Sequence, residues 1–454
     1  MQVDQSHPVA EPAATLTKVT SPDIPSADIR STAASANQGV VPLKICLLGY
    51  RSQPYSGGQG IYIKYLSKAL VETGHQVDVI SGQPYPHLDP RVRLIKMPGM
   101  NLFETGLGSL NVSHLRSMTN IIEWTGKLTG GFSEPRCFGR RVFKYLKMHG
   151  RHYDIIHDNQ CLSWGILKLQ QKGFPLVTTI HHPITSDLHI ALTAAKDWKA
   201  RLLIKRWHSF LTMQKKVAKR LDHVVTVSER SQQDIASAFN LKPSAIDLVY
   251  NGIDTEQFRP MPGVAKKPFR IMATASADAP LKGVRYLLEA VAELAKQYPQ
   301  LELLMVGQLQ PDGTTARLIK RLKLTERIMF VSGISTEQLV AHYAAAQVVV
   351  VPSVYEGFGL PAGEAMACGV PVVSTDGGAL PEVVGDAGII VPAKNSQAIV
   401  NAVAELLDNA DQRIALSQAG RQRIENLFCW QRVAKQMTDY YSQVLASKTH
   451  YANS

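Results

Sequence analysis

The strongest constraint on the fold is the alternation of short β-branched segments with longer segments of helical period. Residues 60–74, "GIYIKYLSKALVETG", space their apolar side chains as an amphipathic helix does and end at Gly74. Strands are predicted around and after this helix at 44–50, 76–81, 153–157, 175–180, 222–227 and 246–250. This alternation predicts an α/β fold, with a parallel sheet wrapped by helices.

The alternation starts again after a Pro- and Lys-containing connector at 251–268. Further strands are predicted at 269–274, 301–307, 327–333, 347–353, 370–375 and 388–392. Because 454 residues are too many for one ordinary core, we expect two doubly wound, Rossmann-like domains, at 41–255 and 256–430. Ligands of such folds bind beyond the carboxyl ends of the strands, so the site is expected in a central cleft that both domains face.

The two ends of the chain are expected to differ from these domains. Residues 1–40 are rich in Ala, Ser, Pro and Thr and lack a basic-then-apolar signal pattern, which predicts a disordered tail. Residues 431–454 are predicted to form a C-terminal helix and tail that pack back on the N-terminal domain.

Composition excludes several classes of protein. No apolar run approaches the roughly 18 residues needed to cross a bilayer. The five cysteines are scattered without a C-x-x-C pair, which argues against a disulfide framework or a zinc site and favours a cytoplasmic protein. The net charge of +12 implies an anionic partner.

A glycine-bearing loop at 355–373, "YEGFGLPAGEAMACGVPVV", follows the buried strand predicted at 347–353. Gly357 and Gly359 allow backbone N–H groups to approach a phosphate, and the start of the following helix favours negative charge. The loop also carries two carboxylates, Glu356 and Glu364, which are suited to accept hydroxyl hydrogen bonds from the two ends of a sugar nucleotide. The alternative from spacing alone is a surface turn with two solvated glutamates.

Residues 356–384, "EGFGLPAGEAMACGVPVVSTDGGALPEVV", resemble the E-x7-E motif of the family 4 (group 1) retaining glycosyltransferases. The likeness extends over most of 44–445 and includes "NGID", "LKG" and the closing "FCWQRVAKQM". The resemblance implies a GT-B fold, an acceptor-binding N-terminal domain and a nucleotide-sugar donor bound mostly by the C-terminal domain. It assigns Glu356 to the sugar hydroxyls and Glu364 to the ribose, and it places Gly357, Phe358, Gly359 and Leu360 against the donor.

Two segments of the N-terminal half are also expected at the cleft. "SQPYSGGQG" places Gly57 and Gly58 between a strand and a helix, where their amides suit a diphosphate or an acceptor, although a plain tight turn is the alternative. "TTIHHP" ends a strand, and its His181 matches the family histidine that reaches the reacting sugar. A neutral histidine there either shares the proton of the acceptor or orients a hydroxyl. Core packing is the alternative for a lone histidine.

Lys282 in "ASADAPLKG" matches the family lysine that neutralises the departing diphosphate. The sequence departs from the family just before it, because Ser276 and Ala277 stand where an arginine is usual. Either another base such as Arg285 compensates or the cationic clamp is weaker. No D-x-D metal motif is present, so neither a metal nor another cofactor is expected.

Residues 196–220 are strongly basic and carry interspersed tryptophan and leucine. They have the pattern of one long helix, and such a helix suits an anionic bilayer surface. The alternative is a buried apolar stripe with a solvated basic face. A nucleic-acid partner is not expected, because it would leave the sugar-nucleotide loop without a role.

Together these features predict a cytoplasmic retaining glycosyltransferase, peripheral at the inner face of the membrane. It would transfer a hexose from a nucleoside-diphosphate sugar to a lipid-linked, glycolipid or polysaccharide acceptor. The alternatives are a nucleotide-sugar epimerase of the same fold and a non-catalytic nucleotide-sugar-binding protein, the latter suggested by the missing arginine.

Overall fold

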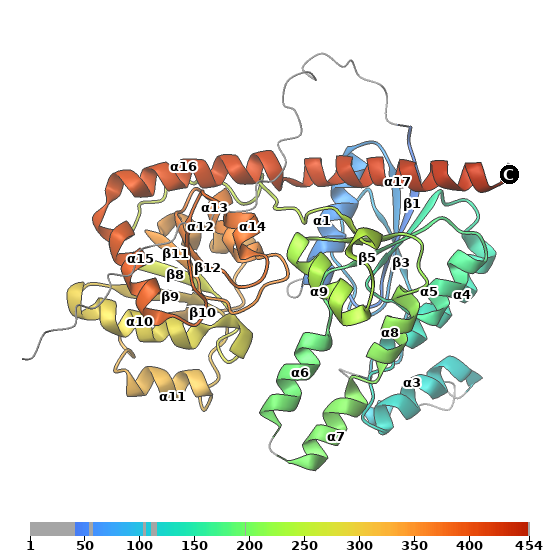
Figure 1. Ribbon diagram of the computed structural model, residues 1–454, viewed down its shortest axis with the longest axis horizontal. Coiled ribbons are helices and arrows are strands. Elements are labelled where there is room, and N and C mark those ends of the chain that lie inside the picture. The colour runs from blue at the N-terminus through green and yellow to red at the C-terminus, as the bar shows by residue number, and fades with distance from the viewer. Residues whose placement is uncertain (1–40, 54–57, 103–105, 110–115, 196, 453–454) are drawn as a thin grey trace, which may run out of the picture. The chain divides into compact units, whose positions relative to one another are not determined.

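The computed structural model describes residues 41–53, 58–102, 106–109, 116–195 and 197–452. Within these residues the strands form two all-parallel sheets, with the order β3-β2-β1-β4-β5-β6-β7 in the first and β10-β9-β8-β11-β12-β13 in the second. Figure 1 shows each sheet among its own helices. The α/β, doubly wound fold predicted from the alternation is confirmed.

The first sheet contains β1 (Lys44–Gly49), β2 (Gln76–Ser81), β3 (Arg93–Lys96), β4 (Ile155–Asn159), β5 (Leu176–Ile180), β6 (Val224–Thr226) and β7 (Asp247–Leu248). The helices of this half, which we call the N-terminal lobe, are α1 (Gly58–Glu72), α3 (Met118–Leu128), α4 (Glu134–His149), α5 (Trp164–Gln171), α6 (Thr185–Ala194), α7 (Trp198–Trp207), α8 (Phe210–Ala218) and α9 (Glu229–Phe239). Short 3-10 turns lie at Leu107–Ser109 and Pro243–Ala245.

The second sheet contains β8 (Arg270–Thr274), β9 (Glu302–Val306), β10 (Ile328–Val331), β11 (Val348–Val351), β12 (Val372–Thr375) and β13 (Ile389–Val391). The helices of this half, the C-terminal lobe, are α10 (Val284–Gln297), α11 (Thr314–Arg321), α12 (Thr336–Ala345), α13 (Leu360–Ala367), α14 (Leu380–Val384), α15 (Ser396–Asp408) and α16 (Ala410–Leu427). A 3-10 turn, η4, covers Pro280–Lys282. Strand β11 is Val-Val-Val-Val and buried throughout, as a central strand of a parallel sheet requires.

The last helix, α17 (Trp430–Ala452), is bonded to side chains of the first sheet and its neighbours. The Tyr441 hydroxyl lies 2.6 Å from Nδ1 of His157 in β4. The Thr438 hydroxyl lies 2.9 Å from Nε2 of His75, the residue before β2. The C-terminal helix therefore shares buried polar contacts with the N-terminal lobe, and Figure 1 shows it running beside α1.

The prediction of a single long helix over 196–220 is wrong, because the segment forms two helices, α7 and α8, with a break at 208–209. The break is stabilised by local bonds. His208 Nδ1 lies 2.8 Å from the carbonyl oxygen of Ile204, and Arg206 donates to the hydroxyl of Ser209 at 3.0 Å. The two halves also differ in burial: α8 buries an apolar face, whereas α7 has no buried residue. Lys196 lies outside the described residues.

Across the described part of the chain, no helix is both long enough and apolar enough to span a membrane.

Candidate active site

The glycine loop lies at the carboxyl end of β11 and leads into α13. Gly359 occupies the left-handed region at φ +105°, and the helix begins immediately after it with Pro361 in its first turn. Gly378 supports the loop from the end of β12. A Cβ on Gly378 would lie 2.2 Å from the carbonyl oxygen of Glu356, and its φ is +71°. The close backbone approach therefore fixes Glu356 at this edge of the sheet.

The structure brings the side chains of Glu356 and Lys282 together. Lys282 Nζ lies 2.6 Å from Glu356 Oε1, and the hydroxyl of Ser353 donates to the same oxygen at 2.8 Å. The two side chains are 31% and 12% exposed, so the pair is accessible from solvent but mostly enclosed. An ammonium held beside a carboxylate at a strand's carboxyl end can meet a phosphate on one side and hydroxyls on the other.

Lys282 and Glu356 are 74 positions apart in the sequence. Gly283, the residue after Lys282, allows their backbones to approach. Gly283 has φ +62°, and a Cβ there would lie 1.9 Å from the carbonyl oxygen of Pro352. The Val354 amide donates to the carbonyl of Leu281 at 2.8 Å. Only glycine permits this approach, so the "LKG" sequence sets Lys282 against the glycine loop.

Glu364 lies on α13, one turn into the helix, and is half-buried. The Tyr343 hydroxyl donates to its Oε2 at 3.2 Å. Burial raises the pKa of the Glu364 carboxyl to about 7, and the Tyr343 hydrogen bond opposes that shift. A carboxylate without a cationic partner gains most from a ligand that donates hydroxyl hydrogen bonds to it.

His181 follows β5, and its ring is oriented by a chain of hydrogen bonds. Asn159 donates its amide N–H to the carbonyl of Gln59 at 3.0 Å, so its Oδ1, 2.6 Å from His181 Nε2, acts as the acceptor. Nε2 therefore carries the proton, and the Nδ1 lone pair is left to accept one. Burial lowers the pKa of His181 to about 3, so the imidazole is neutral at physiological pH.

A buried polar network supports His181 from behind. The Tyr62 ring meets the His181 ring edge-to-face at 4.7 Å. Its hydroxyl lies 3.3 Å from that of Thr179, and Thr179 lies 2.6 Å from Nε2 of His157. The network continues to Tyr441 of α17. The C-terminal helix thus contributes to the position of the histidine.

The glycine loop of the C-terminal lobe contacts the N-terminal lobe beside His181. A Cβ on Gly357 would lie 3.5 Å from the carbonyl oxygen of His181. The carbonyl of Gly357 accepts from the hydroxyls of Ser228 and Ser231, at 2.8 and 3.0 Å. Glu382 accepts from the first amides of α9 at 2.7 and 2.8 Å. These bonds bring His181 and the glycine loop to one place.

The other expected donor contacts are placed as follows. Gly357, Gly359 and the half-buried Leu360 lie on the loop itself. The Phe358 side chain is only 5% exposed and packs edge-to-face on Phe428, so it offers its backbone rather than its ring. Gly58 is the first residue of α1, whereas Gly57 lies outside the described residues.

The positions that lack the usual arginine differ from each other. Ala277 is 4% exposed, and its carbonyl accepts from the hydroxyl of Thr315. Ser276 is exposed. Arg285, the suggested substitute, donates to Glu289 on its own helix at 2.8 Å. Lys282 is therefore the cation that the described structure places directly on Glu356.

Sequence reasoning missed Asn159 and Ser353, which orient His181 and Glu356. Asn159 is the last residue of β4, and Ser353 follows β11. Polar residues at the carboxyl ends of neighbouring parallel strands are the signal that would have found both. The described residues contain no group of three or more His, Cys, Asp or Glu arranged to hold a metal ion.

Two family descriptions match successive parts of this chain. Residues 255–423 match the family described as "Glycosyl transferases group 1", and residues 56–257 match "Glycosyltransferase Family 4". The MMP α-(1→4)-mannosyltransferase of Mycolicibacterium hassiacum is 42% identical over 411 residues, which cover 89% of this chain and 99% of the relative.

Two solved structures are similar along most of their length. Sucrose-phosphate synthase from Thermosynechococcus elongatus superposes with a TM-score of 0.66 at 26% identity, covering 89% of this chain and 100% of that one. Anabaena HepE in complex with UDP-glucose superposes with a TM-score of 0.63 at 18% identity, covering 88% and 100%. The second likeness is one of fold alone.

Proposed function

Because the chain belongs to the group 1, family 4 glycosyltransferases, we propose that it is a retaining mannosyltransferase. In this proposal a nucleoside-diphosphate mannose donates its sugar to a hydroxyl of a saccharide acceptor. The name of the Mycolicibacterium relative supports mannose as the sugar and an α-(1→4) linkage in the product.

The observation that carries the proposal is the pair formed by Lys282 of η4 and Glu356 of the glycine loop, whose Gly357 lies beside the backbone carbonyl of His181. In the reaction the bond from the anomeric carbon to the diphosphate oxygen breaks, and its electron pair leaves on the oxygen. Lys282 Nζ faces that developing charge, where a fixed cation stabilises the transition state more than the ground state. The acceptor oxygen bonds to the anomeric carbon and gives its proton to the departing diphosphate.

The remaining groups hold the donor. Glu356, released from Lys282 when the diphosphate takes the ammonium, accepts hydroxyls of the sugar, and Glu364 accepts those of the ribose. The His181 Nδ1 lone pair accepts one further sugar hydroxyl. The loop amides and the start of α13 receive the diphosphate. None of these roles requires a metal ion or another cofactor.

A donor panel tests the proposal. The purified chain is incubated with UDP-, GDP- and ADP-linked hexoses and a methyl α-mannoside acceptor, and donor-dependent products are separated by mass. We expect transfer from a mannose nucleotide. Interconversion of the nucleotide sugar without acceptor would instead indicate an epimerase, and tight donor binding without any turnover would indicate a non-catalytic binder.

We also propose that the protein is cytoplasmic and attaches to an anionic membrane surface through α7. The helix carries Trp198, Leu202 and Leu203, which are 69%, 62% and 59% exposed, alongside Lys199, Arg201 and Lys205. Apolar side chains with flanking cations suit the headgroup region. Binding to vesicles containing phosphatidylserine should weaken as the salt concentration rises. Each cation removed from α7 should weaken the binding free energy by about 1 kcal/mol. Changing Lys215 and Lys216 of the packed α8 is the matched control, and salt-independent or absent binding would contradict the attachment.

A further inference from the structure

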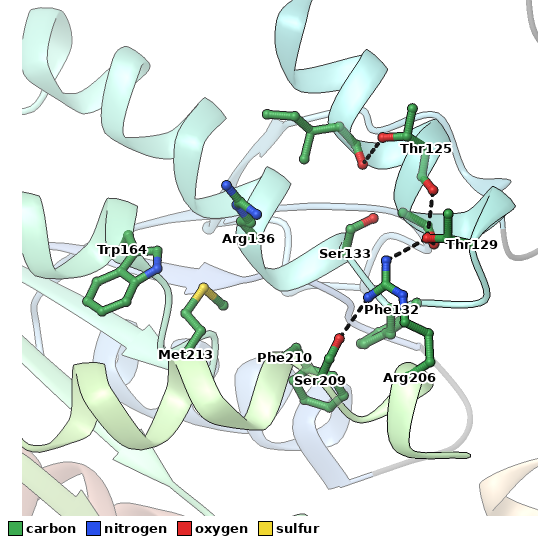
Figure 2. Close-up of a pocket in the computed structure, with 13 residues that line it drawn as sticks. Thr125, Thr129, Phe132, Ser133, Arg136, Trp164, Arg206, Ser209, Phe210 and Met213 are labelled. Atoms are coloured by element: carbon green, nitrogen blue, oxygen red, sulfur yellow. Dashed lines mark hydrogen bonds between the residues drawn. The ribbon is translucent and has the colours of Figure 1, made fainter. Parts of the chain in front are cut away.

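A cavity of about 450 Å³ lies in the N-terminal lobe, apart from the glycine loop. Its walls come from α3 and α4, from the turn between them, and from α7, α8 and the start of α5. Figure 2 shows the side chains that line it, with Trp164 and Met213 at one end and Arg206 and Thr129 at the other. Nothing in the proposed donor site uses this cavity.

One part of the lining is aromatic. Phe132 stacks on Trp207 with ring centroids 5.1 Å apart and meets Phe210 edge-to-face at 5.2 Å. Trp164 is half-buried, and the guanidinium of Arg220 lies 5.9 Å from its ring centroid. These contacts fix large flat surfaces at the cavity, and such surfaces bind the apolar faces of ring-shaped ligands with little loss of conformational entropy.

The other part of the lining is polar. Thr125, Thr129, Ser133 and Ser209 contribute hydroxyls, and Arg136 and Arg206 contribute guanidinium groups. Arg206 donates to the hydroxyl of Thr129 at 2.5 Å and to that of Ser209 at 3.0 Å, so it connects the end of α3 with the start of α8. Arg136 is exposed and makes no hydrogen bond or ion pair with the described residues, which leaves its donors for a ligand. The lining, all of it described, contains no Asp or Glu.

The cavity shares structural elements with the His181 loop. Gln214 of α8 donates to the carbonyl of Gln160 at 3.5 Å. Gln160 accepts from the His181 amide at 2.7 Å and donates to the His182 carbonyl at 2.8 Å. Trp164 begins α5 shortly after Gln160. Helix α8, which lines the cavity, is therefore linked by hydrogen bonds to the segment of the same lobe that carries His181.

We propose that this cavity is an acceptor subsite that binds sugar units remote from the reacting hydroxyl. Flat rings, hydroxyls and a free guanidinium together recognise the two faces and the edge hydroxyls of a pyranose. The inference rests on the proposed function, because it requires a saccharide acceptor. It adds that an oligosaccharide or longer chain is a better acceptor than a single sugar. Phosphate alone fits less well, because the aromatic wall would remain unused.

Acceptor-length kinetics test this subsite. Donor-saturated kcat/KM is measured for α-(1→4)-linked mannosides of increasing length, in wild type and in variants of Trp164 and Arg136. In wild type we expect kcat/KM to rise with length. Trp164→Ala should lower the ratio of the longest to the shortest acceptor about tenfold, and Arg136→Ala several-fold. Trp164→Phe should restore most of the ratio, because it retains an aromatic face.

Two controls separate this effect from misfolding and from loss of charge. Lys147→Ala removes an exposed cation from the same helix as Arg136, away from the cavity, and should keep the wild-type ratio. The donor KM of every variant should match that of wild type. A length ratio that is unchanged in both Trp164→Ala and Arg136→Ala would overturn the subsite.

A titration without donor distinguishes this inference from the proposed function. Binding of the longest mannoside is measured by calorimetry in wild type and Trp164→Ala, with inorganic phosphate as a competitor. Binding that Trp164→Ala weakens and phosphate leaves unchanged supports the subsite even if no transfer is ever observed. Absence of mannoside binding, or its complete displacement by phosphate alone, would contradict it.

Discussion

Donor binding should depend on pH through Glu364, whose pKa burial raises to about 7 in the ligand-free protein. Only the ionised carboxylate accepts two hydroxyl hydrogen bonds, so protonation removes the form that holds the ribose. The pKa is raised, so the group is ionised above about pH 7 and protonated below it. Affinity for the donor should therefore fall as the pH falls through 7.

The size of the effect follows from the pKa. If the donor binds only the ionised form, its Kd rises about fivefold between pH 7 and pH 6 and about fiftyfold between pH 7 and pH 5, and the slope approaches about 1.4 kcal/mol per pH unit below the pKa. The phosphates of a nucleotide sugar are diesters that stay ionised over this range. Asp158 also has a pKa raised to about 7 by burial, but it lies in the N-terminal lobe on β4.

Isothermal titration of the donor between about pH 5 and pH 8 measures this dependence. Glu364→Gln should bind weakly with a flat profile, which assigns the titration to Glu364 rather than to Asp158. Tyr343→Phe removes the hydrogen bond that lowers the pKa of Glu364 and should move the midpoint to higher pH. A wild-type profile that is flat through pH 7, or one that Glu364→Gln leaves unchanged, would refute the reasoning.

Three further predictions concern the loop that holds the donor. Lys282→Ala should lower kcat at least about a hundredfold, since it removes the cation at the leaving group. Lys282→Arg should recover only part of that loss, and wild-type turnover in Lys282→Ala would place the clamp elsewhere. Glu356→Ala should abolish most transfer, whereas Glu364→Ala should mainly raise the donor KM; steady-state kinetics that do not separate the two would contradict their roles. Gly283→Ala should lower both thermal stability and kcat, because its Cβ would lie 1.9 Å from a carbonyl oxygen. At Gly173 (φ +82°) an added Cβ would meet no atom within 4 Å, so Gly173→Ala should cost only about 1 kcal/mol in unfolding free energy, and equal effects of the two substitutions would argue against the contact at Gly283.

The strands of both sheets were predictable where burial on both faces selects uninterrupted β-branched residues. Strand β11 is the plainest case, with four valines that are all buried. Strand β3 was missed because "RLIK" lies at the edge of the sheet with exposed charged ends and only partly buried centres. The break between α7 and α8 was missed because it depends on bonds of His208 and Ser209 rather than on Gly or Pro.

The candidate site was predictable where one motif carries several of its groups. Glu356 and Glu364 lie on a single loop and helix, so their spacing conveys their arrangement. The partners that orient the site come from elsewhere in the chain. Asn159 lies 22 positions from His181, and Ser228 lies 129 positions from the Gly357 carbonyl that it binds. Such pairs form only when the strands and lobes meet, and no local pattern encodes them.

The configuration of the product tests the central claim most directly. The purified chain is given an α-linked nucleoside-diphosphate mannose and a methyl α-mannoside, and the new anomeric centre is examined by NMR before any secondary reaction. Retaining transfer at the site of the Lys282–Glu356 pair predicts a new α-mannosidic bond together with one equivalent of nucleoside diphosphate. A β-linked product, or diphosphate released without any glycosidic bond, would contradict it.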